Sequence, residues 1–589
     1  MRQSMRDVFR TISMLITERL TYLYKWVILA SAVGIVSGVG AIIFKELVEF
    51  STYFFLGTIM GYRVDAGSGA ITIERSWLIP IVVGVGGILS GIITYTLAPE
   101  TEGHGTDSVI KSIHRLAGEI RSRVPIVKAV STAFTLGSGG SAGKEGPIAQ
   151  IGAGFGSLLG SLLKLSSRDR KILVVCGVAG GIGSVFKAPF GAGIFSVEVL
   201  YLQDIEVEAI IPAFISSIIA YVIFASVYGT SHIFSLGNIS FNPIVELPFY
   251  FLLGIVLGVS AIVYIKVFYT VHFFFKKLRI KDHVKPAIGG VIAGLIGTAY
   301  PRTLGSGYEH IQLALTDKLP YFDYLTTPIF KILATAFTIG SGGSGGVFAP
   351  SLVIGGLLGG AFAKTMDMLF PGVSLNTAAF IIIGMMSFFA AAGKVPLASI
   401  IMVAEMTGGY ELMVPAIVSS TIAYIISMKT TIYINQIPHR LGEKLVMLED
   451  VYNIIVRSEP YLLQAEAEKI MVKPIAVLKE DMRIKDALKM VSKYNYRVYP
   501  IVDGNGIFTG YICLEELITA SRRARDLSLE YMRIHSGLAF SKHTPLKKII
   551  DEMINHGVDK VFITDDNGKL IGIITIKDIL RFLTYKEIK

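Results

Sequence analysis

The sequence predicts an all-α protein that crosses a membrane several times, followed by a small soluble α/β module. Of its 589 residues, 52% are hydrophobic and only 17% are charged, whereas soluble proteins carry about 25% charged residues. The mean hydropathy is +0.59. Since roughly 20 apolar residues cross a bilayer, spanning helices are expected at apolar runs such as 26–44, 77–97, 249–268 and 415–428.

The composition changes near residue 437, where charges become frequent and apolar runs shrink to strand length. We therefore expect a membrane domain over 1–436, a connector over 437–465 and a soluble cytosolic module over 466–589. The module is double, with halves at about 466–522 and 537–585, each reading strand, helix, strand, strand, helix around an Asp/Asn-Gly turn. The charged stretch 519–536 between them is expected to be a mobile linker.

The net charge of +10 does not indicate nucleic acid as a partner, because basic residues accumulate on the cytoplasmic loops of membrane proteins. Residues 1–25 carry Arg2, Arg6, Arg10, Arg19 and Lys25 in an amphipathic pattern and lack the features of a cleavable signal peptide. We expect a cytoplasmic N-terminus that lies against the lipid bilayer. The two cysteines, Cys176 and Cys513, are far apart and lack metal spacing, so no disulfide and no metal site is expected.

The most informative feature is an internal duplication. The block KAVSTAFTLGSGGSAGKEGP at 128–147 returns as KILATAFTIGSGGSGGVFAP at 331–350, and 177–198 aligns without a gap on 384–405. Upstream, GHG at 103–105 corresponds to GSG at 305–307. Paired, glycine-interrupted apolar segments in two halves indicate the substrate site of a membrane transporter. Repetition alone leaves open whether the halves are parallel or inverted.

The glycine blocks favour an anion as the substrate. A helix N-terminus exposes unpaired N–H groups and about half a positive charge, and glycine lets a small anion approach them closely. Such a site binds weakly enough to release the ion. Two soluble alternatives fail for the first block: Ser138 stands where a phosphate loop needs its first glycine, and Ala142 where a dinucleotide motif needs its last.

Glu145 is the leading functional candidate, because a carboxylate within a membrane is costly unless it is functional or paired. Charged, it can occupy the place of the anion; protonated, it can swing away and carry a proton. The alternative is a structural salt bridge with Lys144. Phe348 stands at the matching position of the second block, either packing or lining the pore.

GKEGP at 143–147, GVFAP at 346–350 and the glycine-flanked elements resemble the CLC chloride channel and transporter family, and the soluble pair resembles CBS domains. The resemblance implies an inverted-repeat helical fold, a homodimer with one pore per subunit, and Glu145 as the gating residue. It implies that Tyr433 touches the anion through its hydroxyl, although a structural tyrosine is the alternative. The implied anion-binding set is Gly103, His104, Gly105, Gly143, Lys144, Gly146, Gly346, Val347, Phe348, Ala349 and Tyr433.

Two positions depart from the family pattern. His104 replaces the serine of the usual GSGIP element; it either donates to the ion and brings pH sensitivity, or is a loop histidine that points elsewhere. Val199 stands where proton-coupled exchangers often have a second glutamate. We therefore expect chloride transport that is channel-like or loosely coupled to protons, with an obligate chloride/proton antiporter as the alternative. Glu198, which has Glu405 at the duplicate position, is expected to be structural rather than proton-carrying.

In the soluble pair, GIITIKD at 572–578 fits the CBS pattern. The resemblance implies that Thr575 contacts a phosphate and Asp578 the ribose of an adenine nucleotide (ATP, ADP or AMP). Cys513 and Glu516 hold those places in the first half and should bind worse, so we expect at most one nucleotide site per subunit. The alternative is a dimerisation module without a ligand. No cofactor is required for transport.

Two other classes of function fit less well. A membrane-embedded enzyme using Glu145 and His104 as acid and base would need a nucleophile or metal set, and no HExxH motif is found in the sequence. A CBS-regulated transporter of divalent cations would need several intramembrane carboxylates, and the pore-forming blocks offer only Glu145. We expect a transport protein of the plasma membrane of a prokaryote, with both termini cytoplasmic.

Overall fold

The computed structural model describes residues 2–64, 71–237, 243–371, 375–440, 460–474, 476–494, 496–521, 525–532 and 534–585, with a few single residues between them. The chain forms two compact units, Met1–Ile437 and Pro438–Lys589. Side chains are described from Tyr24 onward, so Arg2, Arg6, Arg10 and Arg19 of the basic N-terminal segment fall outside them, whereas Lys25 is described and pairs with Asp169 at 2.7 Å. Most of the expected connector likewise lies outside the described residues.

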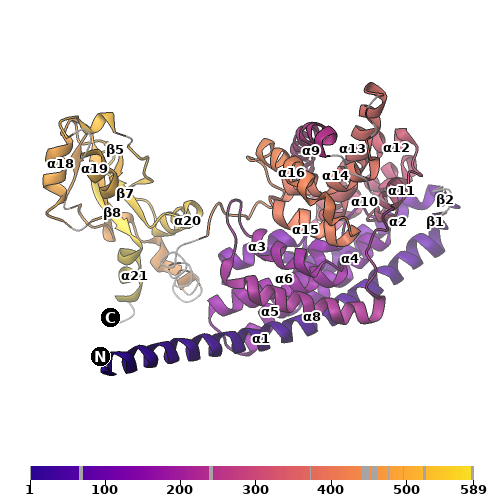
Figure 1. Ribbon diagram of the computed structural model, residues 1–589, viewed down its shortest axis with the longest axis horizontal. Coiled ribbons are helices and arrows are strands. Elements are labelled where there is room, and N and C mark those ends of the chain that lie inside the picture. Colours follow the sequence, from indigo (N-terminus) through magenta and orange to yellow (C-terminus); the bar gives the residue numbers. More distant parts are fainter. Residues whose placement is uncertain are drawn as a thin grey trace. The chain divides into compact units, whose positions relative to one another are not determined.

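The first unit is helical, and its helices occur twice in the same order (Figure 1). The first half contains α1 (Arg2–Thr52), α2 (Ile79–Leu97), α3 (Thr106–Arg115), α4 (Val124–Gly137), α5 (Glu145–Leu162), α6 (Ser167–Val185), α7 (Pro189–Glu198) and α8 (Ile210–Tyr228). The second contains α9 (Pro243–Lys277), α10 (Lys285–Ala299), α11 (Tyr308–Leu315), α12 (Tyr321–Gly340), α13 (Phe348–Leu369), α14 (Thr377–Gly393), α15 (Pro396–Thr407) and α16 (Met413–Ile426). A short hairpin, β1 (Tyr62–Val64) with β2 (Ile71–Ile73), lies in the first half.

Corresponding helices of the two halves pack against each other, α2 on α10 and α7 on α15. Glycines bring α2 and α10 into backbone contact: a Cβ at Gly87 would lie 2.2 Å from the Pro286 carbonyl oxygen, and one at Gly290 would lie 2.6 Å from that of Val83. Small residues serve the same purpose wherever membrane helices approach closely. The reciprocal contacts relate the halves by an approximate two-fold axis.

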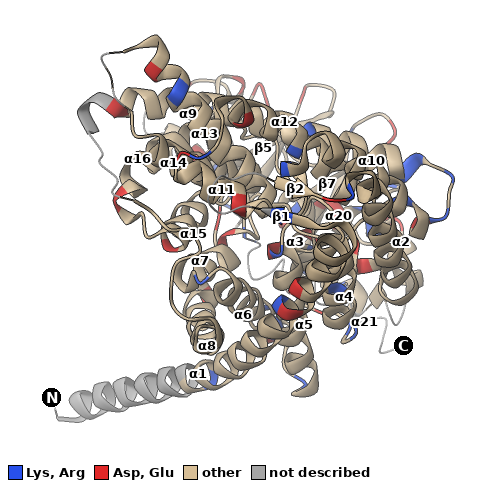
Figure 2. Ribbon diagram, turned by 90° about the vertical axis from the view of Figure 1, so that its right-hand side faces the viewer, with Lys and Arg blue, Asp and Glu red and all other residues tan. Residues whose placement is uncertain are grey.

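The outside of the first unit is apolar. Large hydrophobic side chains such as Ile28, Phe50, Val222 and Val414 are exposed along α1, α8 and α16, and Figure 2 shows few charged residues along the helices. Among the described residues, five helical stretches are long and apolar enough to cross a membrane: Tyr24–Met60, Ser76–Leu97, Val207–Tyr228, Glu246–Lys277 and Phe348–Leu369. The polytopic helical architecture expected from the composition is confirmed.

The C-terminal unit contains two copies of one α/β pattern, as expected. In the first, β3 (Leu478–Lys479) is parallel to β4 (Val498–Val502), which is antiparallel to β5 (Phe508–Cys513), with helices α18 (Ile484–Val491) and α19 (Leu514–Ser521). In the second, β6 (Ala539–Ser541), β7 (Lys560–Thr564) and β8 (Leu570–Thr575) pair in the same way, with α20 (Leu546–His556) and α21 (Ile576–Tyr585).

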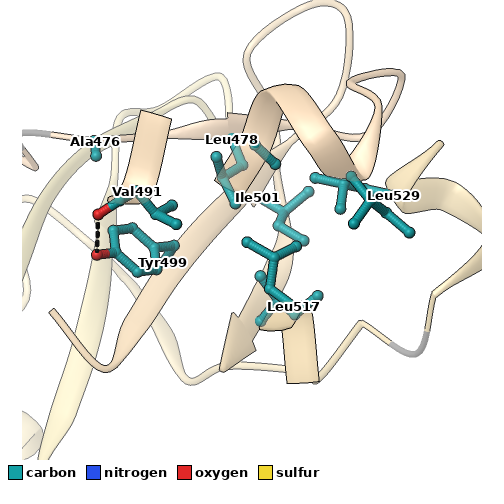
Figure 3. Packing of buried hydrophobic residues seen from close by; sticks show 10 residues of the cluster. Ala476, Leu478, Val491, Tyr499, Ile501, Leu517 and Leu529 are labelled. Carbon is teal, nitrogen blue, oxygen red and sulfur yellow. Dashed lines mark hydrogen bonds between the residues drawn. The ribbon is translucent and has the colours of Figure 1, made fainter. Parts of the chain in front are cut away.

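The core of the first copy includes a residue from the segment between the copies (Figure 3). Leu529 is fully buried beside Ile501 and Leu517 of the sheet and α19. Its amide donates to the Met482 carbonyl at 3.0 Å, and the Ile484 amide donates to the Leu527 carbonyl at 2.9 Å. The expected mobile linker is therefore wrong for residues 525–532, which are bound into the fold because an apolar side chain among the charges fills the core.

Candidate functional site

The two glycine blocks interrupt the helices at corresponding points. The first separates α4, which ends at Gly137, from α5; the second separates α12, which ends at Gly340, from α13. Gly139 and Gly342 have φ angles of +99° and +103°, in the left-handed region that other residues rarely adopt. The chain can therefore turn sharply at both places and start a new helix.

The two blocks bind each other directly. The Gly143 amide donates to the Gly346 carbonyl, and the Gly346 amide to the Gly143 carbonyl, both at 2.7 Å. The serine of each block also bonds a threonine of the other half: Ser141 to Thr335 and Ser344 to Thr132, both at 2.9 Å. The N-termini of α5 and α13 are thereby brought together, so two sets of unpaired helix amides and two positive dipole ends share one place.

The GHG and GSG elements are held against this place by two buried lysines, Lys128 and Lys331, both fully shielded from solvent. Each ammonium donates to two carbonyls: Lys128 to Thr101 at 2.8 Å and Gly103 at 2.7 Å, and Lys331 to Thr303 at 3.0 Å and Gly305 at 2.7 Å. Each lysine thus orients the turn that precedes a short helix, α3 in one half and α11 in the other. The ammonium groups are bonded to the backbone, which leaves dipoles rather than a mobile cation facing the site.

Glu145 is the first residue of α5, and only 4% of it is exposed. Its Oε1 accepts a hydrogen bond from the Tyr308 hydroxyl at 2.8 Å. Its Oε2 lies in the hollow between the two glycine turns, 1.8 Å from where a Cβ on Gly143 would be and 2.7 Å from where one on Gly346 would be. Within the described residues, no ion pair joins Glu145 to Lys144, so the structural salt bridge considered as an alternative is not formed.

His104 and Tyr433 lie beside each other, close to the first turn of α5. Their ring centroids are 5.4 Å apart, and 8% of His104 and 2% of Tyr433 are exposed. A Cβ on Gly146 would lie 1.7 Å from the His104 carbonyl oxygen, so α3 and α5 meet through their N-terminal turns. Among the described residues, His104 Nδ1 is buried without a hydrogen-bond partner. An unpaired ring nitrogen here is available to a ligand.

The position of Tyr433 is fixed by hydrogen bonds that its sequence neighbours Ile432 and Asn435 form with α9 and α3. The Asn435 amide donates to Asp107 Oδ1 of α3 at 2.8 Å, and its side chain donates to the other carboxylate oxygen. The Tyr269 hydroxyl of α9 donates to the Ile432 carbonyl at 2.7 Å. The segment that ends the first unit is thus fastened to both halves, and this is what brings Tyr433 to His104.

The remaining predicted anion-binding residues fall into two groups. Gly103 and Gly105 flank His104 with left-handed φ angles of +72° and +84°. Lys144 precedes α5, Val347 precedes α13, and Ala349 lies in the first turn of α13. The Gly143 amide donates to the Gly346 carbonyl and the Gly346 amide to the Gly143 carbonyl, so these two amides join the two turns to each other.

Phe348 packs in an aromatic cluster. Its ring lies 4.5 Å from that of Phe389 and 5.7 Å from that of Phe186, both edge to face. Only 2% of Phe348 is exposed. Its backbone still begins α13, whose first amides have no intrahelical acceptor.

Glu198 of α7 and Glu405 of α15 each accept hydrogen bonds from the first turn of the other helix. The Glu198 carboxylate accepts from the Leu397 and Ala398 amides at the start of α15, at 3.1 and 2.7 Å. The Glu405 carboxylate accepts from Phe190 and Gly191 at the start of α7, at 3.1 and 2.6 Å. Each glutamate thus caps a helix of the opposite half, a geometry that supports the structural role expected for Glu198.

In the C-terminal unit, Thr575 and Asp578 lie together where β8 meets α21. Asp578 Oδ2 accepts from the Thr575 hydroxyl at 2.6 Å and from the Thr575 amide at 3.0 Å. In the first copy, the Cys513 amide donates to Glu516 Oε2 at 3.2 Å at the corresponding place. The two copies therefore present different side chains from one backbone arrangement.

Sequence reasoning missed Tyr308. It directly follows the GSG element at 305–307, and so opens a short helix aimed at the site, as Thr106 does after GHG. The duplication supplied a signal for it, because Thr106 and Tyr308 each follow a glycine element and begin a short helix.

Comparison with known proteins agrees with this geometry. A family model described as voltage gated chloride channel matches residues 86–428, and one described as CBS domain matches residues 467–523 and 536–585. The H(+)/Cl(-) exchange transporter ClcA of Yersinia pseudotuberculosis is 28% identical over 409 residues, covering 68% of this chain and 84% of that protein.

Solved structures share the fold. The crystal structure of a slow cyanobacterial Cl-/H+ antiporter matches with a TM-score of 0.61 at 25% identity, covering 69% of this chain and 94% of that chain. A eukaryotic CLC transporter matches with a TM-score of 0.59 over 95% of this chain and 98% of that chain; at 19% identity it shows the fold alone.

Proposed function

We propose a mechanism for this chain, which belongs to the voltage gated chloride channel (CLC) family and is therefore a membrane anion transporter rather than an enzyme. Chloride binds where the N-termini of α5 and α13 meet, and the carboxylate of Glu145 competes with it for that place. The observation that carries the proposal is the position of Glu145 Oε2 in the hollow between Gly143 and Gly346. This buried oxygen has no hydrogen-bond partner among the described residues, and it packs against the two glycine turns at the place proposed for the anion.

Gating follows from the exchange of these two negative groups. While the carboxylate is charged it fills the hollow and blocks the anion. When it takes a proton, its attraction to the helix dipoles falls, the side chain leaves the hollow, and chloride enters. His104 and Tyr433 donate from the α3 side, where the unpaired ring nitrogen and the hydroxyl provide neutral donors that permit release.

We propose that coupling to protons is loose. Val199 offers no carboxylate for proton entry, and Glu198 is engaged in capping α15. No second glutamate then delivers protons to Glu145, so the number of chloride ions moved per proton is not fixed. Obligate antiport is the rival mechanism, favoured by the relatives that are named H(+)/Cl(-) exchangers.

The experiment uses the purified full chain in chloride-loaded liposomes, with an ionophore clamping the potential and a pH probe inside. Loose coupling predicts chloride efflux that exceeds proton uptake by a ratio that varies with the imposed gradients. A ratio that stays constant under every gradient would establish obligate antiport instead.

Replacing Glu145 by glutamine tests the gating carboxylate. Glutamine keeps the size of the side chain but cannot titrate, so we expect the pH dependence of chloride flux and any proton movement to disappear. Glu309→Gln, the same change at an exposed residue beside Tyr308, should leave both intact. Unaltered pH dependence in the Glu145 variant would refute its role.

The wider assembly is also proposed. We infer a homodimer with one pore per subunit, in the plasma membrane of a prokaryote, with both termini in the cytoplasm. The membrane domain over 1–436 then joins, through the connector over 437–465, a CBS pair over 466–589 that binds an adenine nucleotide at Thr575 and Asp578. The proximity of that hydroxyl and carboxylate supports the nucleotide site, because together they can accept and donate to a phosphate and a ribose.

A further inference from the structure

Three side chains of the C-terminal unit gather into a cluster with the composition of a metal site. The thiol of Cys513, a carboxylate oxygen of Glu516 and a ring nitrogen of His535 all lie within 4.8 Å of one another. Sulfur, nitrogen and oxygen together are the ligand set of Zn²⁺, whereas Mg²⁺ and Ca²⁺ prefer oxygen alone. The donor set is therefore selective for a transition-metal ion.

Each ligand is held by a different part of the fold. Cys513 ends β5 and Glu516 lies in the first turn of α19. The Cys513 amide bonds Glu516 Oε2, so Oε1 is turned to His535 Nε2, 2.8 Å away. His535 exchanges two backbone hydrogen bonds of 2.9 Å with Tyr511, and their rings stack at 5.3 Å. The three donors are thus fixed before any ion arrives, which favours tight binding.

The cluster stands where the second copy has its candidate nucleotide residues. Cys513 lies opposite Val498 at the end of β5, as Thr575 lies opposite Lys560 at the end of β8. Thiol and glutamate thus replace the hydroxyl and aspartate, and an imidazole is added. We propose that the first CBS copy binds a zinc-type divalent transition-metal ion through Cys513, Glu516 and His535.

Binding displaces protons. The thiol, whose pKa is raised by burial and by the Glu516 carboxylate, is deprotonated when it becomes a ligand. The ion also replaces the hydrogen bond between Glu516 Oε1 and His535 Nε2. These two side chains are 39% and 29% exposed, so an ion reaches them from solvent and a water molecule completes a tetrahedral set of four ligands.

Titration of the full chain with Co²⁺, which substitutes for zinc and reports a bound thiolate by a charge-transfer absorption band, tests the site. Purified protein in detergent is first stripped with a chelator. We expect the band to appear with one ion per subunit and to be displaced by Zn²⁺. The chain has two cysteines, Cys176 and Cys513, so a single variant of each is enough to identify the thiolate ligand.

Matched variants separate this site from adventitious binding. Cys513→Ser should abolish the band, and His535→Gln should weaken Co²⁺ binding by at least about 100-fold. Cys176→Ser, in buried α6, and Asp578→Asn, in the other copy, should leave the band unchanged. A band that persists in Cys513→Ser, or no band in the unmodified chain, would overturn the proposal.

Stability provides a second readout that does not depend on cobalt spectroscopy. At about 100 times the dissociation constant, Zn²⁺ should raise the unfolding temperature of the C-terminal unit by roughly 5–10 °C. Cys513→Ser should show no rise. An equal rise in the variant would show that zinc stabilises the chain elsewhere and would exclude this site.

Discussion

The carboxylate of Glu145 has two neighbours of different kinds. One oxygen faces two glycine turns, and the other accepts from Tyr308. The hydroxyl stabilises the charged carboxylate in the hollow, because hydrogen bonds to charged groups contribute about 1.5–3 kcal/mol. In the proposed mechanism, Tyr308 therefore holds the carboxylate that competes with the anion.

Removing this hydroxyl should favour chloride. Tyr308→Phe is expected to weaken the hold on the carboxylate by at least about 1.4 kcal/mol, which is tenfold in its equilibrium with the anion. Calorimetric titration should give about tenfold tighter chloride binding, and efflux from liposomes should rise. Tyr324→Phe is the matched control. The Tyr324 hydroxyl donates to the Ala314 carbonyl of α11, the helix that Tyr308 begins, and does not donate to Glu145. Equal chloride affinity in both variants would argue against a role of the Tyr308 hydroxyl in holding the Glu145 carboxylate.

The residues that sequence reasoning could and could not find differ in how they reach the site. Glu145 and the first glycine turn lie in one short block of the sequence, so their role can be predicted from neighbouring residues. Tyr308 and His535 arrive from distant segments, and their partners depend on tertiary packing. Spacing rules detect ligands on one element, so they could not join His535 to Cys513.

At the scale of elements, the short helices α7 and α15 depend on each other. In the first turn of each helix, two backbone amides donate hydrogen bonds to a glutamate carboxylate of the other helix. A carboxylate at a helix N-terminus is stabilised by the dipole as well as by the hydrogen bonds. The pair therefore joins the two halves through electrostatics that neither half has alone.

Neutralising either glutamate should cost stability and leave coupling unchanged. Glu198→Gln and Glu405→Gln are each expected to lower the free energy of unfolding by about 1–2 kcal/mol. Thermal unfolding in detergent measures the loss, and the two variants serve as controls for each other because their contacts are equivalent. If Glu198→Gln alone stopped proton movement while retaining full stability, Glu198 would be a proton carrier.

At the scale of the whole molecule, the duplication predicted the helical architecture well. Repeated letters at 128–147 and 331–350 correspond to repeated helix breaks, because glycine with a left-handed φ dictates the turn locally. The orientation of the halves could not come from repetition, since parallel and inverted copies share one sequence pattern. The segment 525–532 was misjudged for a related reason: its charges are local, whereas the pocket that receives Leu529 is built by the sheet.

The two units should communicate through the nucleotide site. We expect ATP, ADP or AMP to bind the full chain and to change chloride flux, and Asp578→Ala to weaken binding by at least about tenfold because the ribose loses its acceptor. Calorimetry of the detergent-solubilised protein and flux with nucleotide on one side measure both effects. Asp566→Ala, an exposed residue of the same copy, should bind normally. Identical affinities in the two variants would remove Asp578 from the site.

The exchange of caps between α7 and α15 has a consequence for biosynthesis. Gly191 leaves the ribosome 214 residues before Glu405, which is roughly 10–40 s at about 5–20 residues per second. During that interval the start of α7 has no carboxylate to accept from its amides inside an apolar environment. The first turn of α7 therefore lacks its capping carboxylate until the second half of the membrane unit has been synthesised.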